Sequence, residues 1–174
     1  MKSLHLLRHA KSSWKDPGLN DHDRPLNKRG RQTAKMMAAY LRRAKIVPDV
    51  VICSTALRAQ LTLDPIIKTT KKPPRIVFAR EIHDGAQRTL WEQLWNVPES
   101  ATSVLLIGHN PALQDLALEL AHADLNKLLL SAGGKFPTGA MASFRFDGPW
   151  KELEPRGAVL ASFVTPRALS GRTR

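Results

Sequence analysis

Continuous apolar runs alternate along this chain with longer segments in which apolar residues recur every three or four positions. A continuous run between polar residues is typical of a buried strand, and such runs occupy residues 3–8, 49–54, 75–79, 103–108, 140–146 and 158–164. The wider spacing is typical of an amphipathic helix, and it occurs in residues 27–45, 56–70, 87–96 and 111–122. The pattern therefore predicts alternating strands and helices, with two strands last.

Local signals refine two of these helices. In the helix predicted over 27–45, the apolar positions between 34 and 41 share one face, and Asn27 is suited to cap the first turn. In the helix predicted over 56–70, Pro65 is expected to bend or restart the helix, because proline lacks the backbone N–H.

The alternation predicts an α/β domain in which a mostly parallel sheet lies between helical layers. A length of 174 residues suits a single domain, 1–174, with one core, and the polar segment 166–174 is expected to fray. In open sheets of this kind, ligands bind beyond the carboxyl ends of the strands. The residues that follow each strand are therefore the first candidates for a functional site.

Composition narrows the cellular setting. No apolar run approaches the ~18 residues needed to span a membrane, and the first residues are too short and interrupted for a signal peptide. The single cysteine, Cys53, lies in an apolar run and is predicted to pack as a small hydrophobic residue. These features predict a cytoplasmic protein without a membrane partner.

The net charge is +12, from 27 Lys and Arg against 15 Asp and Glu, and residues 1–48 hold 12 of the basic residues but only 3 acidic ones. Such a surplus indicates an acidic ligand, which could be a phosphorylated substrate, a nucleic acid or an acidic protein; a role in solubility alone is the alternative. No DNA-binding motif or single-strand platform accompanies the charge, so no specific nucleic-acid partner is predicted.

Three predicted strands are followed by histidine or arginine. Arg8 and His9 follow the first strand, Arg58 follows the second, and His109 follows the strand over 103–108. Because the carboxyl ends of parallel strands meet at one edge, we expect these four side chains to gather there. After His109, Asn110 and Pro111 are expected to begin a helix as its cap and first residue, which would place His109 near anion-binding N–H groups.

Two arginines and two histidines suit a phosphoryl group. Arginine offers a fixed fork of donors to phosphate oxygens and stays charged. Neighbouring arginines lower the pKa of a histidine, and a neutral imidazole nitrogen can attack phosphorus, while a second histidine can stabilise the charge of the transition state. Positive groups repel metal ions and no ligand signature is present, so no metal is predicted.

Four segments carry a resemblance to a known family. "LRHA" at 7–10, "DRPLNKRG" at 23–30, "STALRAQLT" at 54–62 and "LLIGHNP" at 105–111 resemble the histidine phosphatase superfamily, which has the phosphoglycerate mutase-like fold. "RHAKSSW" at 8–14 and "KFPTGAMA" at 135–142 are typical of its small SixA-type branch of phosphohistidine phosphatases. The resemblance implies a three-layer α/β/α sandwich and no metal or organic cofactor.

Carried over to this chain, the family pattern makes His9 the nucleophile that becomes phosphorylated, and it places Arg8, Arg58 and His109 in the phosphate pocket. Ser12 is a further candidate phosphate contact. The remaining candidate is Arg24, which is expected either to bind phosphate or to order its loop through a salt bridge to a neighbouring aspartate. The chain departs from larger relatives at Ala10, where they have glycine, and at Lys15, where they often have asparagine.

The proton donor is the least defined part of the pattern. Ester-hydrolysing relatives use a glutamate four residues before a glycine, and Glu81 has that spacing to Gly85, with His83 and Asp84 as neighbouring rivals. Phosphohistidine depends less on such a donor, because its imidazole leaving group can itself be protonated near neutral pH, whereas an alkoxide needs a positioned acid.

These features predict a metal-independent phosphatase that hydrolyses phosphohistidine, or a related phosphoramidate, on a protein through a phosphohistidine intermediate. The alternative is a phosphatase for small phosphomonoesters, and the remote alternative is a non-enzymatic polyanion-binding protein. The substrate is accordingly a phosphorylated protein or a small phosphorylated molecule.

Overall fold

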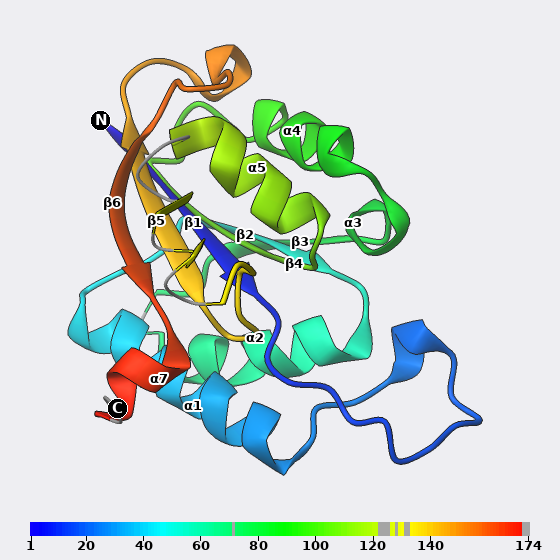
Figure 1. Cartoon of the computed structure of the whole chain (residues 1–174). Helices are drawn as coiled ribbons and strands as arrows, with labels where there is room; N and C mark the ends of the chain where they lie inside the picture. The colour runs from blue at the N-terminus through cyan, green and yellow to red at the C-terminus, as the bar shows by residue number, and fades with distance from the viewer. Residues whose placement is uncertain (71, 122–125, 128, 131–132, 172–174) are drawn as a thin grey trace.

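A mixed sheet of six strands organises the chain (Figure 1). The computed structural model describes residues 1–70, 72–121, 126–127, 129–130 and 133–171. The strands, in chain order, are β1 (Lys2–Arg8), β2 (Val50–Ser54), β3 (Arg75–Ala79), β4 (Ser103–Gly108), β5 (Met141–Phe146) and β6 (Val159–Val164). In space they lie in the order β3-β2-β4-β1-β5-β6.

The helices connect and cover these strands. They are α1 (Lys28–Arg43), α2 (Leu57–Thr69), α3 (Glu81–Asp84), α4 (Gln87–Trp95), α5 (Ala112–Ala121) and α7 (Pro166–Leu169), with short 3-10 helices η1 (Asp21–Asp23) and η2 (Trp150–Glu152). Strands β1 to β4 pair in parallel, whereas β5 is antiparallel to both β1 and β6. The predicted α/β class, with a mostly parallel sheet, is confirmed.

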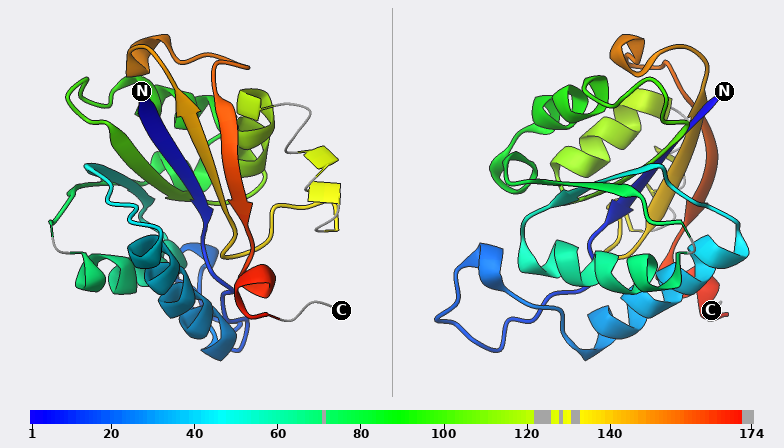
Figure 2. Two further views of the ribbon diagram at one scale, coloured as in Figure 1. Left: turned by 90° about the vertical axis from the view of Figure 1, so that its left-hand side faces the viewer. Right: turned by 180° about the vertical axis from the view of Figure 1, so that it is seen from behind.

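The alternation of side chains along the buried strands builds the two faces of the sheet. One face carries Leu4, Leu6 and Leu106 and packs against apolar residues of α4 and α5. The other carries Leu7 and Ile107 and packs against α1 and α2. Figure 1 and Figure 2 show the resulting three layers, with α4 and α5 on one side of the sheet and α1 and α2 on the other.

The local predictions have mixed outcomes. Asn27 caps α1 as predicted, because its Oδ1 accepts from the backbone N–H of Gly30 at 2.8 Å. Helix α2 is continuous through Pro65, so the predicted restart is wrong. Helix α3 was not predicted, and the segment predicted to fray begins with helix α7.

Two further predictions concern the chain as a whole. Cys53 is fully buried in the core, and burial raises the pKa of its thiol to about 12, so it packs as a hydrophobic residue as predicted. Among the described residues, no helix combines the length and the apolar character that crossing a membrane requires.

Candidate active site

The carboxyl ends of the parallel strands form one edge of the sheet, and chemically active side chains gather there. Arg8 is the last residue of β1, and His9 continues the chain beside the end of β4, since its N–H donates to the carbonyl oxygen of Gly108 at 3.1 Å. Arg58 lies in the first turn of α2, just beyond β2. His109 directly follows β4. The rings of His9 and His109 lie 4.8 Å apart between centroids, so the predicted gathering of these residues at one edge is found.

His9 is buried, and one hydrogen bond fixes its tautomer. Its Nδ1 lies 2.7 Å from the carbonyl oxygen of Ala10, and a carbonyl only accepts, so Nδ1 carries the proton. The pKa of His9 is lowered to about 4, mainly by burial and also by the charges of Arg58 and Arg8, against the opposing effects of the hydrogen bond to Ala10 and of Asp21. At neutral pH the ring is therefore neutral, with its lone pair on Nε2.

His109 is held by Ser54. Nε2 of His109 lies 2.8 Å from Oγ of Ser54, a fully buried residue at the end of β2. Burial lowers the pKa of His109 well below its usual value, with smaller contributions from His9, Arg58 and His83. His109 is thus a neutral, oriented ring at neutral pH.

The start of α5 differs from the sequence prediction. The helix begins at Ala112, and Oδ1 of Asn110 is buried without a hydrogen-bond partner among the described residues, so Asn110 is not the predicted cap. The carbonyl oxygen of His109 instead accepts from the N–H of Leu113 at 2.9 Å. The helix therefore starts later, and a backbone hydrogen bond rather than a side chain closes its first turn.

The two predicted pocket arginines carry charge into this buried edge. Nη1 of Arg8 donates to the carbonyl oxygen of Phe136 at 2.7 Å, while its Nε is buried without a partner among the described residues. Burial lowers the pKa of Arg8, and the neighbouring charge of Arg58 lowers it further. An unpartnered buried donor beside a second guanidinium is typical of a site that receives an anion.

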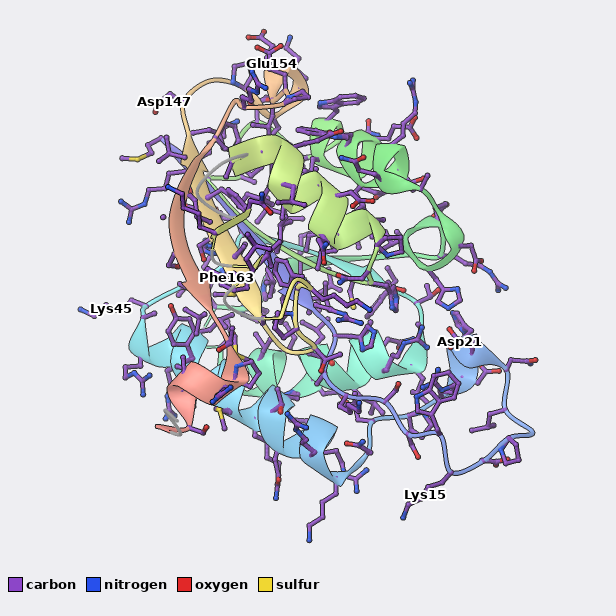
Figure 3. All side chains as sticks on the ribbon, in the orientation of Figure 1. Lys15, Asp21, Lys45, Asp147, Glu154 and Phe163 are labelled. Carbon is purple, nitrogen blue, oxygen red and sulfur yellow. The ribbon has the colours of Figure 1, made fainter. Side chains whose placement is uncertain are left out.

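Residues 10–27, which include η1, form a loop that projects beyond the sheet edge next to α2 (Figure 3). Hydrogen bonds of Arg24 hold the two sides of this loop together. Nη2 of Arg24 donates to Oγ of Ser12 at 2.6 Å, and Nε donates to the carbonyl oxygen of Ser13 at 3.0 Å. Nη1 donates to Oδ1 of Asp21 at 2.6 Å, so the loop-ordering salt bridge considered for Arg24 is present. Ser12 and Arg24 bind each other, and a phosphate contact by either residue stays a prediction.

The carboxylate of Asp21 accepts hydrogen bonds from several of these side chains. Oδ2 of Asp21 accepts from Nη2 of Arg58 at 2.7 Å and lies 3.1 Å from Nε2 of His83, and Nη1 of Arg58 donates to the Asp21 carbonyl oxygen. Burial raises the pKa of the Asp21 carboxyl, but hydrogen bonds from His83, Arg58 and Arg24 outweigh it and hold the pKa below its usual range. An anionic oxygen is therefore strongly favoured beside Arg58.

The structure places two further histidines at the site: His83, which the sequence analysis named only as a rival to Glu81, and His22, which it did not predict there. The ring of His83 lies 5.3 Å from that of His109, and the ring of His22 lies 5.1 Å from that of His83. With His9, these residues form a row of four rings along the sheet edge. A signal for His83 existed, because it follows the strand over 75–79 as Arg8, Arg58 and His109 follow theirs.

Glu81, the predicted proton donor, lies in a different environment. Its side chain is exposed and takes part in no hydrogen bond or ion pair within the described residues. Its spacing to Gly85 has a packing cause, because a Cβ at Gly85 would lie 2.2 Å from the carbonyl oxygen of Glu81. Among the described residues, no group of three or more His, Cys, Asp or Glu side chains could hold a metal ion.

Comparisons with known proteins agree with this arrangement. The profile of the histidine phosphatase superfamily (branch 1) matches residues 4–87. Uncharacterized protein Rv1276c of Mycobacterium tuberculosis is 36% identical over 163 residues, which cover 92% of this chain and all of the relative. SixA of Agrobacterium tumefaciens superposes with a TM-score of 0.79 at 28% identity, covering 95% of this chain and 99% of that one. A SixA protein of Nakamurella superposes with the same score and identity, covering 95% and 96%.

This chain belongs to the histidine phosphatase superfamily, in its SixA-type branch, and is a hydrolase of phosphoric groups. Its fold is the phosphoglycerate mutase-like α/β fold that the resemblance implied. Its substrates are accordingly phosphorylated molecules.

Proposed function

We propose that this phosphatase hydrolyses phosphohistidine, or a related phosphoramidate, on a protein, and that His9 carries the phosphoryl group between the two halves of the reaction. The observation that carries the proposal is the state of His9. Its Nδ1 is occupied by the Ala10 carbonyl oxygen and the pKa of the ring is lowered to about 4, so Nε2 is an unprotonated nucleophile at neutral pH.

In the first half of the reaction, Nε2 of His9 attacks phosphorus, a P–N bond forms, and the bond from phosphorus to the leaving nitrogen breaks with its electron pair on that nitrogen. Arg8 and Arg58 bind the phosphoryl oxygens, and His109 stabilises the charge that develops on them. In the second half, water attacks phosphorus, the P–N bond to His9 breaks, and inorganic phosphate leaves. The scheme uses no metal or organic cofactor.

Two observations support a protein substrate. The likeness to SixA of Agrobacterium tumefaciens, described as a "putative phosphohistidine phosphatase", extends over 95% of this chain. The loop next to the site also exposes Lys11 and Lys15 beside Trp14, whose side chain is 76% exposed. Exposed cations at the site suit an acidic protein surface.

A small-molecule phosphomonoester phosphatase is the second candidate, and one observation favours it. An ester needs a positioned acid, and the structure places His83 beside His109 even though Glu81 lies exposed. Glu81 as the donor stays a prediction. The two candidate functions use the same nucleophile, and their substrates differ in the leaving group.

The test measures phosphate release from a phosphohistidine-containing protein and from an aryl phosphate, with wild type and His9→Ala side by side. We expect wild type to release phosphate from phosphohistidine, and His9→Ala to lose at least about a thousandfold in rate, because the covalent step is abolished. Radiolabelled substrate followed by quenching at alkaline pH, where phosphohistidine survives, should label wild type but not His9→Ala. His5→Gln is the matched control, since it removes a buried histidine outside the site.

A variant His9→Ala that cleaves as fast as wild type would contradict the assigned nucleophile. Cleavage of the aryl phosphate without cleavage of phosphohistidine would favour the small-molecule candidate. Salt-dependent DNA binding without any phosphatase activity would favour the remote alternative, a polyanion-binding protein that uses the basic residues of 1–48.

A further inference from the structure

His83 is positioned by an element that packs directly on the end of β4. Ile82, its neighbour in α3, is buried in the core, and a Cβ at Gly108 would lie 3.3 Å from Cγ2 of Ile82. His83 follows Ile82 and turns to the site edge, where its ring meets that of His109 edge to face at 5.3 Å and 88°. The side chain is only 14% exposed. His83 is therefore fixed beside the site by core packing.

The contact with Asp21 shows where a substrate oxygen can bind. Oδ2 of Asp21 lies 2.7 Å from Nη2 of Arg58 and 3.1 Å from Nε2 of His83. One oxygen position is thus within hydrogen-bond distance of the proposed phosphate-binding Arg58 and of His83 at once. A substrate that replaces this carboxylate on Arg58 brings an oxygen or leaving atom bonded to phosphorus within reach of Nε2 of His83.

Carboxylates face both ring nitrogens of His83. Nε2 faces Oδ2 of Asp21, and Nδ1 contacts Oδ1 of Asp84. Ionised carboxylates only accept hydrogen bonds, so both contacts are satisfied together when both ring nitrogens carry a proton. Asp84 can hold this orientation when a substrate displaces Asp21, which makes Asp84 a positioning residue.

The geometry points to His83 as the group that protonates the leaving atom, an assignment that rests on the proposed function and extends it. As Nε2 of His9 bonds to phosphorus and the bond to the leaving oxygen breaks, the electron pair goes to that oxygen and the proton of His83 Nε2 follows it. In the second step His83, now neutral, accepts a proton from the attacking water, and phosphate leaves His9. The proton balance closes after each turnover.

This assignment widens the substrate class of the site. Without a donor, only substrates with stable leaving groups, such as phosphoramidates and activated aryl esters, are cleaved efficiently. With His83 as the donor, phosphomonoesters of phenols and alcohols of high pKa are substrates as well.

The dependence of rate on the leaving group tests the assignment. The kcat/KM of wild type, His83→Gln, Asp84→Asn and Glu81→Gln is measured on aryl phosphates from 4-nitrophenyl to unsubstituted phenyl phosphate, and on a phosphohistidine peptide. For His83→Gln we expect a loss within about threefold on 4-nitrophenyl phosphate and the peptide, but about a hundredfold or more on phenyl phosphate, because general acids contribute about 10²–10⁴-fold. Asp84→Asn should show the same trend to a smaller extent, and Glu81→Gln should show none.

The outcomes separate this inference from the proposed function. The assignment of His83 is overturned if His83→Gln loses kcat/KM equally on all the aryl phosphates. It is also overturned if the dependence on the leaving group appears in Glu81→Gln instead. In either case, labelling of His9 still supports the proposed function. If wild type forms no phosphorylated His9 from any of these substrates, the proposed function itself fails. Thermal unfolding of each variant identifies a uniform loss that comes from misfolding.

Discussion

A single hydrogen bond, from Nδ1 of His9 to the carbonyl oxygen of Ala10, decides which nitrogen of the ring can react. The same geometry explains why the loop after β1 must be fixed. The N–H of Ala10 donates to Oγ1 of Thr62 at 3.0 Å, and that hydroxyl donates to the carbonyl oxygen of Arg58 at 2.6 Å. Thr62 therefore links the nucleophile loop to the turn that carries Arg58.

The tautomer and the charge of His9 can be observed directly. We expect nitrogen-15 NMR of the ring to show a protonated Nδ1 and an unprotonated Nε2 at pH 7, and a titration with a midpoint near pH 4, because the pKa is lowered to about 4. His9→Asn identifies the resonances. A midpoint near the ordinary value of about 6.5, or a proton on Nε2, would contradict the mechanism.

Sequence reasoning brought Arg8, His9, Arg58 and His109 to one edge because strand ends are visible as boundaries of apolar runs. It named His83 only as a rival to Glu81 and did not predict its contact with His109, since the four-residue helix α3 is too short to show a periodic pattern. Nor could it find the contact of Asp21 with Arg58, which joins residues 37 positions apart and depends on where the loop folds back.

Helix α1 and the nucleophile loop approach each other through a glycine. A Cβ at Gly30 would lie 2.1 Å from the carbonyl oxygen of Lys11, and the N–H of Asn27 donates to that same oxygen at 3.0 Å. The sequence "DRPLNKRG" thus contains both Asn27, which caps α1, and Gly30, which permits this close contact because it has no Cβ. The capping role of Asn27 can be predicted from the sequence, whereas the need for glycine at position 30 follows only from the tertiary contact with Lys11.

Gly30→Ala is expected to push the loop away from α1. We expect a loss of about 1–3 kcal/mol in the free energy of unfolding, because the clash is with backbone and outweighs the higher helix propensity of alanine, together with a lower kcat. Gly18→Ala is the matched control, since its Cβ would meet only a side-chain oxygen, of Asp16, at 3.3 Å. Urea unfolding measures both, and equal stabilities would rule out the contact.

Buried histidines make the stability of the entire fold depend on pH. The pKa of His5 is lowered to about 4, mainly by burial and to a smaller extent by the charge of Arg145, and the pKa values of His9 and His109 are lowered too. Between about pH 6.5 and 4 the unfolded chain binds protons that the folded chain does not. Stability is therefore full above pH 6.5 and falls as the pH drops towards 4.

The effect can be measured by urea unfolding at pH 7 and 4.5, where most carboxylates are still ionised. We expect the free energy of unfolding to fall by about 2–3 kcal/mol for each such histidine, and the fall to be smaller by that amount in His5→Gln. His5 is the histidine to substitute in this test because it lies outside the site, where its Nδ1 is hydrogen-bonded to Oγ of Ser143. An identical fall in wild type and variant would show that His5 does not contribute.

The amino terminus and the candidate active site lie at opposite ends of strand β1, which matters when the protein is immobilised. The amino group of Met1 lies 3.3 Å from Oδ1 of Asp147 at the end of β5, whereas His9 lies past the far end of β1. The seven residues of β1 separate the two ends by about 20 Å. A bead, sensor surface or fusion partner attached at the amino terminus would therefore hold the molecule with its reactive edge facing outward, so immobilised protein should process large phosphorylated partners as readily as free protein does.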